Sequence, residues 1–146
     1  MTEAAPECAF IVEVGQLRLG KFDLGGVLYH ANYFHVYEVA RETLLKAIGI
    51  PYQSIMDREM HLPLVETHQS YIRPIRYTDE LSVAIWISEL KQSSFKFNYE
   101  ITVSSSPDPV HRAWTRVSAV KESDDNFRPV RLPEDMRQAL APYIRS

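Results

Sequence analysis

The residues of this sequence that are best suited to chemistry stand close together in its first quarter. Asp23 is followed by Gly25 and Gly26, and His30 comes where the longest predicted helix begins. A carboxylate in a glycine turn before a helix can act as base or nucleophile, and the free N–H groups of the helix end can polarise an oxygen. The spacing is also compatible with a simpler interpretation, in which Asp23 stabilises the turn and His30 caps the helix or packs against it.

The composition is that of one ordinary globular domain covering residues 1–146, with 45% hydrophobic and 24% charged residues. A net charge of -3 lacks the basic excess typical of nucleic-acid-binding proteins. The single Cys8 excludes an internal disulfide, and the 5 histidines show no metal-ligand spacing. No apolar run could span a membrane and the N-terminus has no apolar signal core, so we expect a cytoplasmic protein.

One long helix is predicted to follow the glycine turn. Tyrosine and aliphatic residues recur at three- and four-residue steps, which predicts a helix over residues 31–48. Val39 and Leu45 widen this stripe, so we expect the helix to be buried over much of its circumference. Gly49 suits the position just after the helix, and Pro51 prevents its continuation. The helix therefore begins at the candidate site and runs away from it.

The rest of the chain is predicted to form mostly strands, at residues 8–19, 61–72, 81–90, 95–103 and 110–121. Polar and apolar residues alternate over 95–103, which predicts one buried and one solvent-exposed face. We expect a loop at 104–109, an irregular segment at 122–131 and a short helix beginning at Pro133. Strands grouped after one helix favour an antiparallel α+β domain, with a curved sheet wrapped around the helix.

The segment Asp23-Leu-Gly-Gly-Val-Leu-Tyr-His-Ala-Asn-Tyr resembles the D-x-G-G-V-x-Y-x-x-N-Y signature of hotdog-fold acyl-CoA thioesterases. It is most similar to the 4-hydroxybenzoyl-CoA thioesterase group, which includes the bacterial Tol–Pal-associated thioesterases. Tyr71-Ile-Arg-Pro-Ile resembles the family's F-x-x-P-I-x-x-G-D; Asp79 matches its last position and Thr78 replaces its glycine. The family often has D-T-D where this chain has Lys21-Phe22-Asp23, so the first acid is missing.

The resemblance implies a hotdog fold, in which a curved five-stranded antiparallel sheet wraps one central helix. It also implies hydrolysis of an acyl-CoA thioester to a free acid and CoA. By matching positions, Asp23 would be the nucleophile or the general base, and the backbone N–H of His30 would polarise the thioester carbonyl. No cofactor or metal is implied, since CoA is part of the substrate. The family further implies a homodimer with the site at its interface, commonly within a homotetramer.

The candidates for contacts with the substrate are Gly26, Tyr29, Tyr33, Arg73, Lys91 and Lys96. The tyrosines, together with Tyr37, could line an acyl pocket, or they could belong to the core or to an interface. The basic residues could hold the CoA phosphates, or they could be ordinary solvated residues at strand ends. Gly26 could supply a positive φ or a close approach of the backbone to the ligand.

Two other functions stay open. A hotdog hydratase or dehydratase would act on enoyl-thioesters, but its D-x-N-P-[aliphatic]-H pattern spaces acid and histidine differently from Asp23 and His30. A non-catalytic module could bind acyl-CoA or an acyl-carrier protein without turnover. The sequence does not identify the acyl group.

Overall fold

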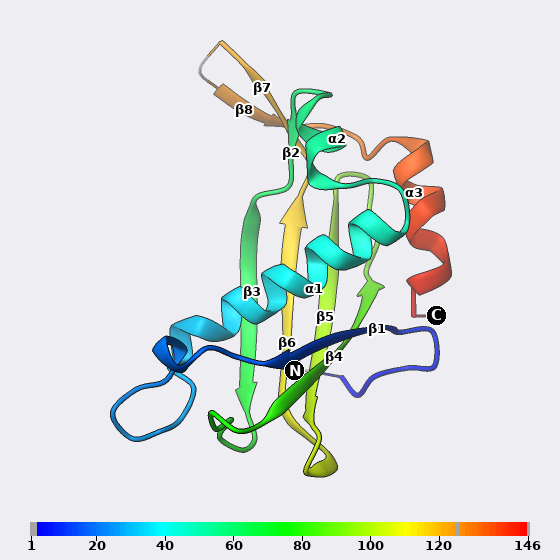
Figure 1. Ribbon diagram of the computed structural model, residues 1–146. Helices are drawn as coiled ribbons and strands as arrows, with labels where there is room; N and C mark the ends of the chain where they lie inside the picture. The colour runs from blue at the N-terminus through cyan, green and yellow to red at the C-terminus, as the bar shows by residue number, and fades with distance from the viewer. Residues whose placement is uncertain (1–2, 125, 146) are drawn as a thin grey trace.

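An antiparallel sheet wrapped around one long helix forms the body of the protein (Figure 1). This computed structural model describes residues 3–124 and 126–145. The sheet has 5 strands in the order β1-β4-β5-β6-β3, and all neighbouring pairs are antiparallel. The strands are β1 (Phe10–Gln16), β3 (Leu64–Tyr71), β4 (Glu80–Ser88), β5 (Ser94–Val103) and β6 (Ser106–Ser118). The predicted α+β class and the wrapped helix are confirmed.

The central helix α1 (Tyr33–Ala47) continues from a 3₁₀ turn at His30–Asn32. Its C-terminal end is a Schellman motif, and Gly49 lies just after the helix, as predicted. Gly49 has a φ of 85°, and its N–H donates to the carbonyl of Lys46 at 3.2 Å. The next N–H, that of Ile50, donates to the carbonyl of Leu45 at 2.9 Å. Only a residue without a Cβ adopts this φ at low cost, which is why the helix ends here.

The burial of α1 differs from the prediction. Its buried residues form a single face, made of Tyr33, Val36, Tyr37, Ala40, Leu44 and Leu45. Val39 is 45% exposed and Phe34 is 39% exposed, so the helix is covered on one side only. The prediction of burial over much of its circumference is therefore wrong for the single chain, because the sheet curves around one face of the helix and leaves the other open.

The inner face of the sheet, toward α1, is apolar through most of its length. Its buried side chains on β4 and β5 are Leu81, Val83, Ile85, Ile87, Phe95, Phe97, Tyr99 and Ile101. These are the alternate positions predicted to face the core, and they pack with α1 into one hydrophobic cluster. Burying this apolar area away from water is the main force that holds helix and sheet together.

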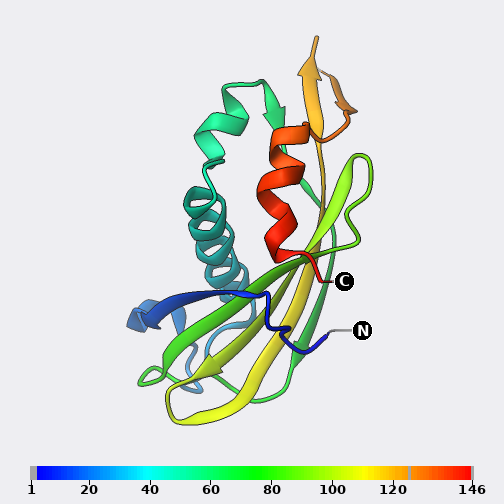
Figure 2. The same cartoon turned by 90° about the vertical axis from the view of Figure 1, so that its right-hand side faces the viewer.

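The outer face is less exposed than predicted. Asn98 is only 3% exposed, although it lies on the face of 95–103 that was predicted to be solvent-exposed, and its neighbour Trp86 on β4 is fully buried. The termini lie together beside this face (Figure 2), where the N–H of Ala5 donates to the carboxylate of Glu100 at 3.2 Å. Arg145 in turn donates to the carbonyl of Ala4 at 2.7 Å. The terminal segments therefore cover part of a face that the alternation alone assigned to solvent.

A second, 3-stranded sheet projects beyond one end of the first and has the order β2-β7-β8 (Figure 1, top). Its strands are β2 (Met60–His61), β7 (Val120–Ser123) and β8 (Asn126–Pro129). The prediction of an irregular segment at 122–131 is wrong, because this stretch contains the β7–β8 hairpin. The strand predicted at 61–72 is two strands, separated at Leu62 and Pro63.

The loop predicted at 104–109 is much shorter, because β6 begins at Ser106 and Val103 already pairs with Ser106. Pro107 and Pro109 suggested a loop, but a register shift between Ile101 and Val103 marks an irregular start to this pairing, where proline is tolerated. Two short helices complete the fold, α2 (Tyr52–Met56) and α3 (Glu134–Leu140). Pro133 is the residue before α3 rather than its first residue. No helix among the described residues is both long and apolar enough to cross a bilayer.

Candidate functional site

The glycine turn after Phe22 is closed by its own backbone and by the side chain of Asp23. The N–H of Asp23 donates to the carbonyl of Val27, and the N–H of Gly26 donates to the carbonyl of Asp23, both at 3.0 Å. Oδ1 of Asp23 accepts from the N–H of Gly25 at 2.9 Å and from that of Val27 at 3.4 Å. The structural role considered for Asp23 is therefore real. Its carboxylate is nevertheless exposed, and Oδ2 has no hydrogen-bond partner among the described residues.

Gly26 supplies the conformation that the turn needs. Its φ is 78°, and a Cβ added there would meet no atom within 4 Å. The requirement is therefore one of backbone conformation rather than of space. At Gly25 a Cβ would lie 3.2 Å from Oδ1 of Asp23, so a larger residue there would require the carboxylate to shift slightly.

Hydrogen bonds connect the glycine turn to Ile75 and to the start of the central helix. The N–H of Leu28 donates to the carbonyl of Ile75 at 2.8 Å. The carbonyl of Lys21 accepts from the N–H of Tyr29 at 3.1 Å and from the side-chain amide of Asn32 at 2.8 Å. These bonds fix the turn relative to the start of α1. They explain why a residue such as Asn32 belongs in this short segment.

His30 is the first residue of the 3₁₀ turn that leads into α1. Its backbone N–H donates to no backbone acceptor among the described residues, as expected at a helix start. The imidazole is exposed and lies against the ring of Tyr29, with 4.3 Å between ring centroids. The position thus offers a free N–H at the positive end of a helix dipole.

A pocket of about 380 Å³ brings the candidate groups together. It is lined by Asp23, Val27, Leu28, His30, Tyr33, Tyr71, Ile72, Arg73 and Pro74. Its volume lies within the range of small-molecule sites, roughly 300–1,000 Å³. A second pocket of about 450 Å³ lies between α2 and the small sheet. That pocket holds no carboxylate, whereas the first combines the carboxylate of Asp23 with the start of α1 at His30.

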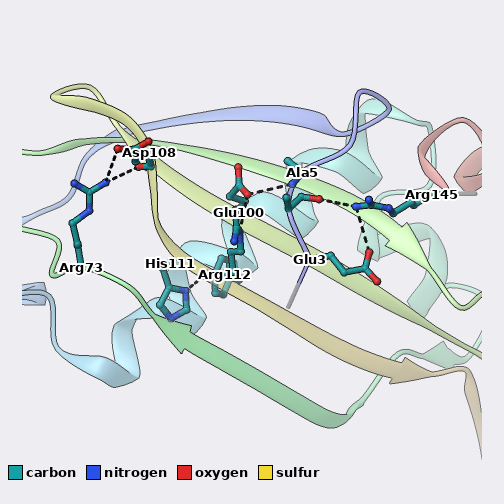
Figure 3. Close-up of polar contacts among 10 residues, drawn as sticks. Glu3, Ala5, Arg73, Glu100, Asp108, His111, Arg112 and Arg145 are labelled. Carbon is teal, nitrogen blue, oxygen red and sulfur yellow. Dashed lines mark hydrogen bonds and ion pairs between the residues drawn. The ribbon is translucent and has the colours of Figure 1, made fainter. Parts of the chain in front are cut away.

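Arg73 lines the pocket, but its guanidinium turns toward the start of β6. Nη2 of Arg73 lies 3.3 Å from the carbonyl of Asp108 and 3.8 Å from its carboxylate (Figure 3). The side chain is 45% exposed, so it lies within reach of a ligand. Gly26 and Tyr29 flank the pocket in sequence without lining it.

Lys91 and Lys96 lie away from this pocket. Lys96 is on the outer face at the other end of β5, where Nζ is 2.6 Å from the carboxylate of Glu89 and 3.9 Å from the ring centroid of Trp114. Lys91 lies in the connection between β4 and β5, at the same end. The pocket of one chain includes neither lysine, and their predicted contacts with phosphates stay a prediction.

The back wall of the pocket joins the predicted candidates Tyr33 and Tyr37 to Tyr71 and His111, two residues that were not predicted to belong to the site. The rings of Tyr33 and His111 stack at 4.2 Å, and the ring of Tyr71 meets His111 edge-on at 4.7 Å. The hydroxyl of Tyr37 is hydrogen-bonded to Nδ1 of His111. The available signal was a histidine at an inward-facing position of a strand otherwise filled by Ala113, Thr115 and Val117.

Burial determines the protonation states of His111 and Tyr33 in this wall. His111 is fully buried, and burial lowers the pKa of its imidazole to about 3, so the ring is neutral at physiological pH. Burial likewise raises the pKa of Tyr33 to about 12, so its hydroxyl keeps its proton. No three His, Cys, Asp or Glu side chains among residues 3–124 and 126–145 come together as metal ligands.

Comparison with known proteins gives a consistent picture. Residues 17–140 match the model of the "Thioesterase-like superfamily". The chain is 30% identical to a 1,4-dihydroxy-2-naphthoyl-CoA hydrolase of Gloeothece citriformis, over 86% of this chain and 87% of that protein. It is 26% identical to the acyl-CoA thioesterase YbgC of Haemophilus influenzae, over 81% and 85%. Among solved structures, the DHNA-CoA thioesterase of Staphylococcus aureus superposes with a TM-score of 0.83 at 25% identity, over 91% of this chain and 89% of that one.

Proposed function

This chain belongs to the thioesterase-like superfamily and has its hotdog fold, and we propose that it hydrolyses an acyl-CoA thioester at the pocket of Asp23 and His30. The observation that carries the proposal is that an exposed carboxylate and a free helix-end N–H line one pocket. Arg73, on the rim of the same pocket, is the basic residue best placed to meet a phosphate of CoA. The reaction needs no cofactor, because CoA is part of the substrate.

The proposed chemistry begins with the carboxylate of Asp23. As a general base it would take a proton from water, whose oxygen then bonds to the carbonyl carbon. The negative charge that develops on the carbonyl oxygen would be held by the N–H of His30. Collapse of this intermediate breaks the C–S bond, releases CoA as its thiolate and leaves the free acid. A thiolate departs without a strong acid, so one base and one oxyanion donor form a sufficient set. Direct attack by Asp23 on the carbonyl is the alternative.

The turn supports this role. Two backbone N–H groups fix Oδ1, while Oδ2 has no partner among the described residues. A carboxylate held by one oxygen keeps a defined direction, and a defined direction is what a catalytic base requires. The structural and the catalytic interpretation of Asp23 are thus compatible.

A panel of aromatic, short aliphatic and long aliphatic acyl-CoAs, with release of free thiol as the readout, tests the proposal. We expect at least one substrate to be hydrolysed much faster by the wild type than by Asp23→Ala. The proposal is lost if no substrate shows this difference. Loss of crotonyl-CoA absorbance would indicate a hydratase instead, and calorimetric binding without turnover would indicate a binding module.

A homodimer, assembled further into a homotetramer, is also part of the proposal. β3 is an edge strand, and its outer edge pairs with no strand among the described residues. Val65 and Tyr71 on this strand are 56% and 55% exposed, and Tyr71 belongs to the pocket. Exposed apolar edge strands tend to pair with another chain. Light scattering that finds only monomer at working concentrations would contradict this. The Tol–Pal branch and the cytoplasmic location stay predictions.

A further inference from the structure

Asn32 is the residue immediately before α1, and its side chain does not cap that helix. Asparagine is one of the residue types that most often cap a helix, by accepting a hydrogen bond from an N–H of the first turn. Here no side-chain cap is formed, and the first turn of α1 holds no acidic residue. The presence of asparagine at this position therefore needs an explanation other than capping.

The amide of Asn32 points back along the chain instead. Its Nδ2 donates to the backbone carbonyl of Lys21 at 2.8 Å, across 11 positions of sequence, and the bond is partly buried. Lys21 stands two residues before Asp23, and Asn32 stands two residues after His30. The bond therefore joins the two ends of the short stretch that contains both groups of the proposed reaction.

This bond is the side-chain link between the glycine turn and the helix. Among the described residues, no other side-chain hydrogen bond joins residues 21–28 to residues 30–47. The other anchors of the turn are backbone contacts with Ile75 and Arg76, which attach it to the segment before β4. The position of the turn relative to α1 therefore depends on the connecting backbone and on Asn32.

Asn32 belongs to a different pocket from the one that holds the reacting groups. Neither Asn32 nor Lys21 lines the pocket of Asp23 and His30. Both line a smaller pocket of about 230 Å³, which is formed by residues of β1, of α1 and of the segment between them. A substrate in the first pocket would not touch Asn32, so any effect of this residue on the reaction must pass through the turn.

We propose that Asn32 is a positioning residue, which holds the carboxylate of Asp23 at the correct distance from the N–H of His30. A general base and an oxyanion donor act on one carbonyl group, so their separation has to stay within narrow limits. Loss of the bond would let the turn shift relative to α1. This inference rests on the proposed thioesterase activity and adds to it a residue that touches no substrate.

The variant Asn32→Asp tests the proposal directly. It keeps the shape of the side chain and removes the N–H groups that donate to Lys21. Aspartate is as good a cap as asparagine and suits the positive end of a helix, so α1 itself should lose nothing. We expect kcat and kcat/KM to fall together by about 10- to 100-fold, with little change in KM. The loss should be alike for aromatic and aliphatic acyl-CoAs, because Asn32 contacts none of them.

A second variant and a control complete the series. Asn32→Leu removes the donor without adding a charge, and it should lose about as much activity as Asn32→Asp. Arg137→Met is the matched control, because it removes a bond of the same length, 2.8 Å, from Nη1 to the carbonyl of Lys91 and away from the pocket. It should leave kcat and KM at the wild-type values. All rates are measured well below the lowest melting temperature, so that partial unfolding does not contribute.

A double-mutant cycle with Asp23→Asn separates positioning from stability. If Asn32 acts only by placing the carboxylate of Asp23, Asn32→Leu should cost nothing more once that charge is gone. A role in stability or in substrate binding would instead show its full cost in both backgrounds. We therefore expect the double variant to be as active as Asp23→Asn alone.

Three outcomes would overturn the inference. Asn32→Asp could keep the wild-type kcat, which would mean that position 32 needs only a residue suited to a helix start. The loss could appear in KM alone, which would indicate substrate binding. The effects of Asn32→Leu and Asp23→Asn could be additive. Failure of the proposed function is distinct from these, because Asp23→Asn itself would then leave the rate unchanged.

Discussion

Replacing Asp23 by asparagine separates its two roles. An asparagine side chain keeps an oxygen that can accept from the N–H of Gly25, now at 2.9 Å, and from that of Val27, now at 3.4 Å. The turn should therefore stay intact, while the charge needed for base or nucleophile is lost. We expect kcat/KM to fall by about 10³-fold, which corresponds to about 4 kcal/mol of transition-state stabilisation. The melting temperature should change little.

Replacing Asp23 by alanine removes both roles at once. The two hydrogen bonds of the exposed turn are together worth about 1 kcal/mol, since such bonds replace bonds to water. For a domain of this size that loss lowers the melting temperature by about 2–4 °C. The activity should fall about as far as in Asp23→Asn. The two variants thus share a kinetic defect and differ in stability.

Thiol release from the best acyl-CoA substrate measures kcat/KM, and calorimetric melting measures the melting temperature of each variant. Asp57→Asn is the matched control, because Asp57 is an exposed aspartate that also accepts a local hydrogen bond, from Gln53 at 2.9 Å. It should leave kcat/KM at the wild-type value. The reasoning is refuted if Asp23→Asn retains wild-type activity. It is also refuted if the two Asp23 variants lose activity only in proportion to their loss of stability.

Three further predictions follow from the same region. Gly26→Ala should destabilise the protein by about 1 kcal/mol, because the φ of 78° at this position is costly for a residue with a Cβ. In thermal melting, Gly26→Asn should recover part of the lost stability. Equal stability of Gly26→Ala and the wild type would contradict this prediction. Tyr37→Phe should cost about 1–3 kcal/mol in urea unfolding, because it leaves Nδ1 of buried His111 unpaired; a neutral effect would mean that this bond contributes nothing. The pKa of His111 is about 3 in the folded protein against 6.5 when unfolded, so the unfolded chain binds the proton first as the pH falls. Its contribution to stability is complete above pH 6.5 and is lost at up to about 1.4 kcal/mol per pH unit down to pH 3. Unfolding at pH 7 and pH 4 should therefore show a smaller acid loss in His111→Phe than in the wild type, and equal losses would disprove the shift.

The parts of the fold that were predicted correctly depend on local signals. The whole Schellman motif lies within Leu45 to Ile50, so the end of α1 could be located from the local sequence around Gly49. Asp23 and His30 are likewise near each other in the chain, and short backbone bonds connect the turn to the helix. Local geometry of this kind is determined by residue type and spacing, with little help from distant parts of the chain.

The parts that were missed depend on pairing between distant segments. Arg73 and Asp23 line the same pocket, whereas Lys96 lies at the opposite end of the sheet, and this difference is set by strand register. Thr78, which stands where the family signature has glycine, lies in a turn with no positive φ. This turn is closed by the bond from the N–H of Arg76 to the carboxylate of Asp79 at 2.8 Å. Composition alone could not distinguish either case.

The division between local and distant signals has a functional consequence. The proposed base and oxyanion donor come from one short segment, so the type of reaction can be inferred from a motif of consecutive residues. The aromatic wall behind the pocket contains Tyr71 on β3 and His111 on β6, and this pair exists only because those strands pair in one register. Substitutions in this pair should therefore change which acyl group is preferred without moving the groups that break the thioester. Substitutions in the glycine turn should lower the rate for every substrate alike.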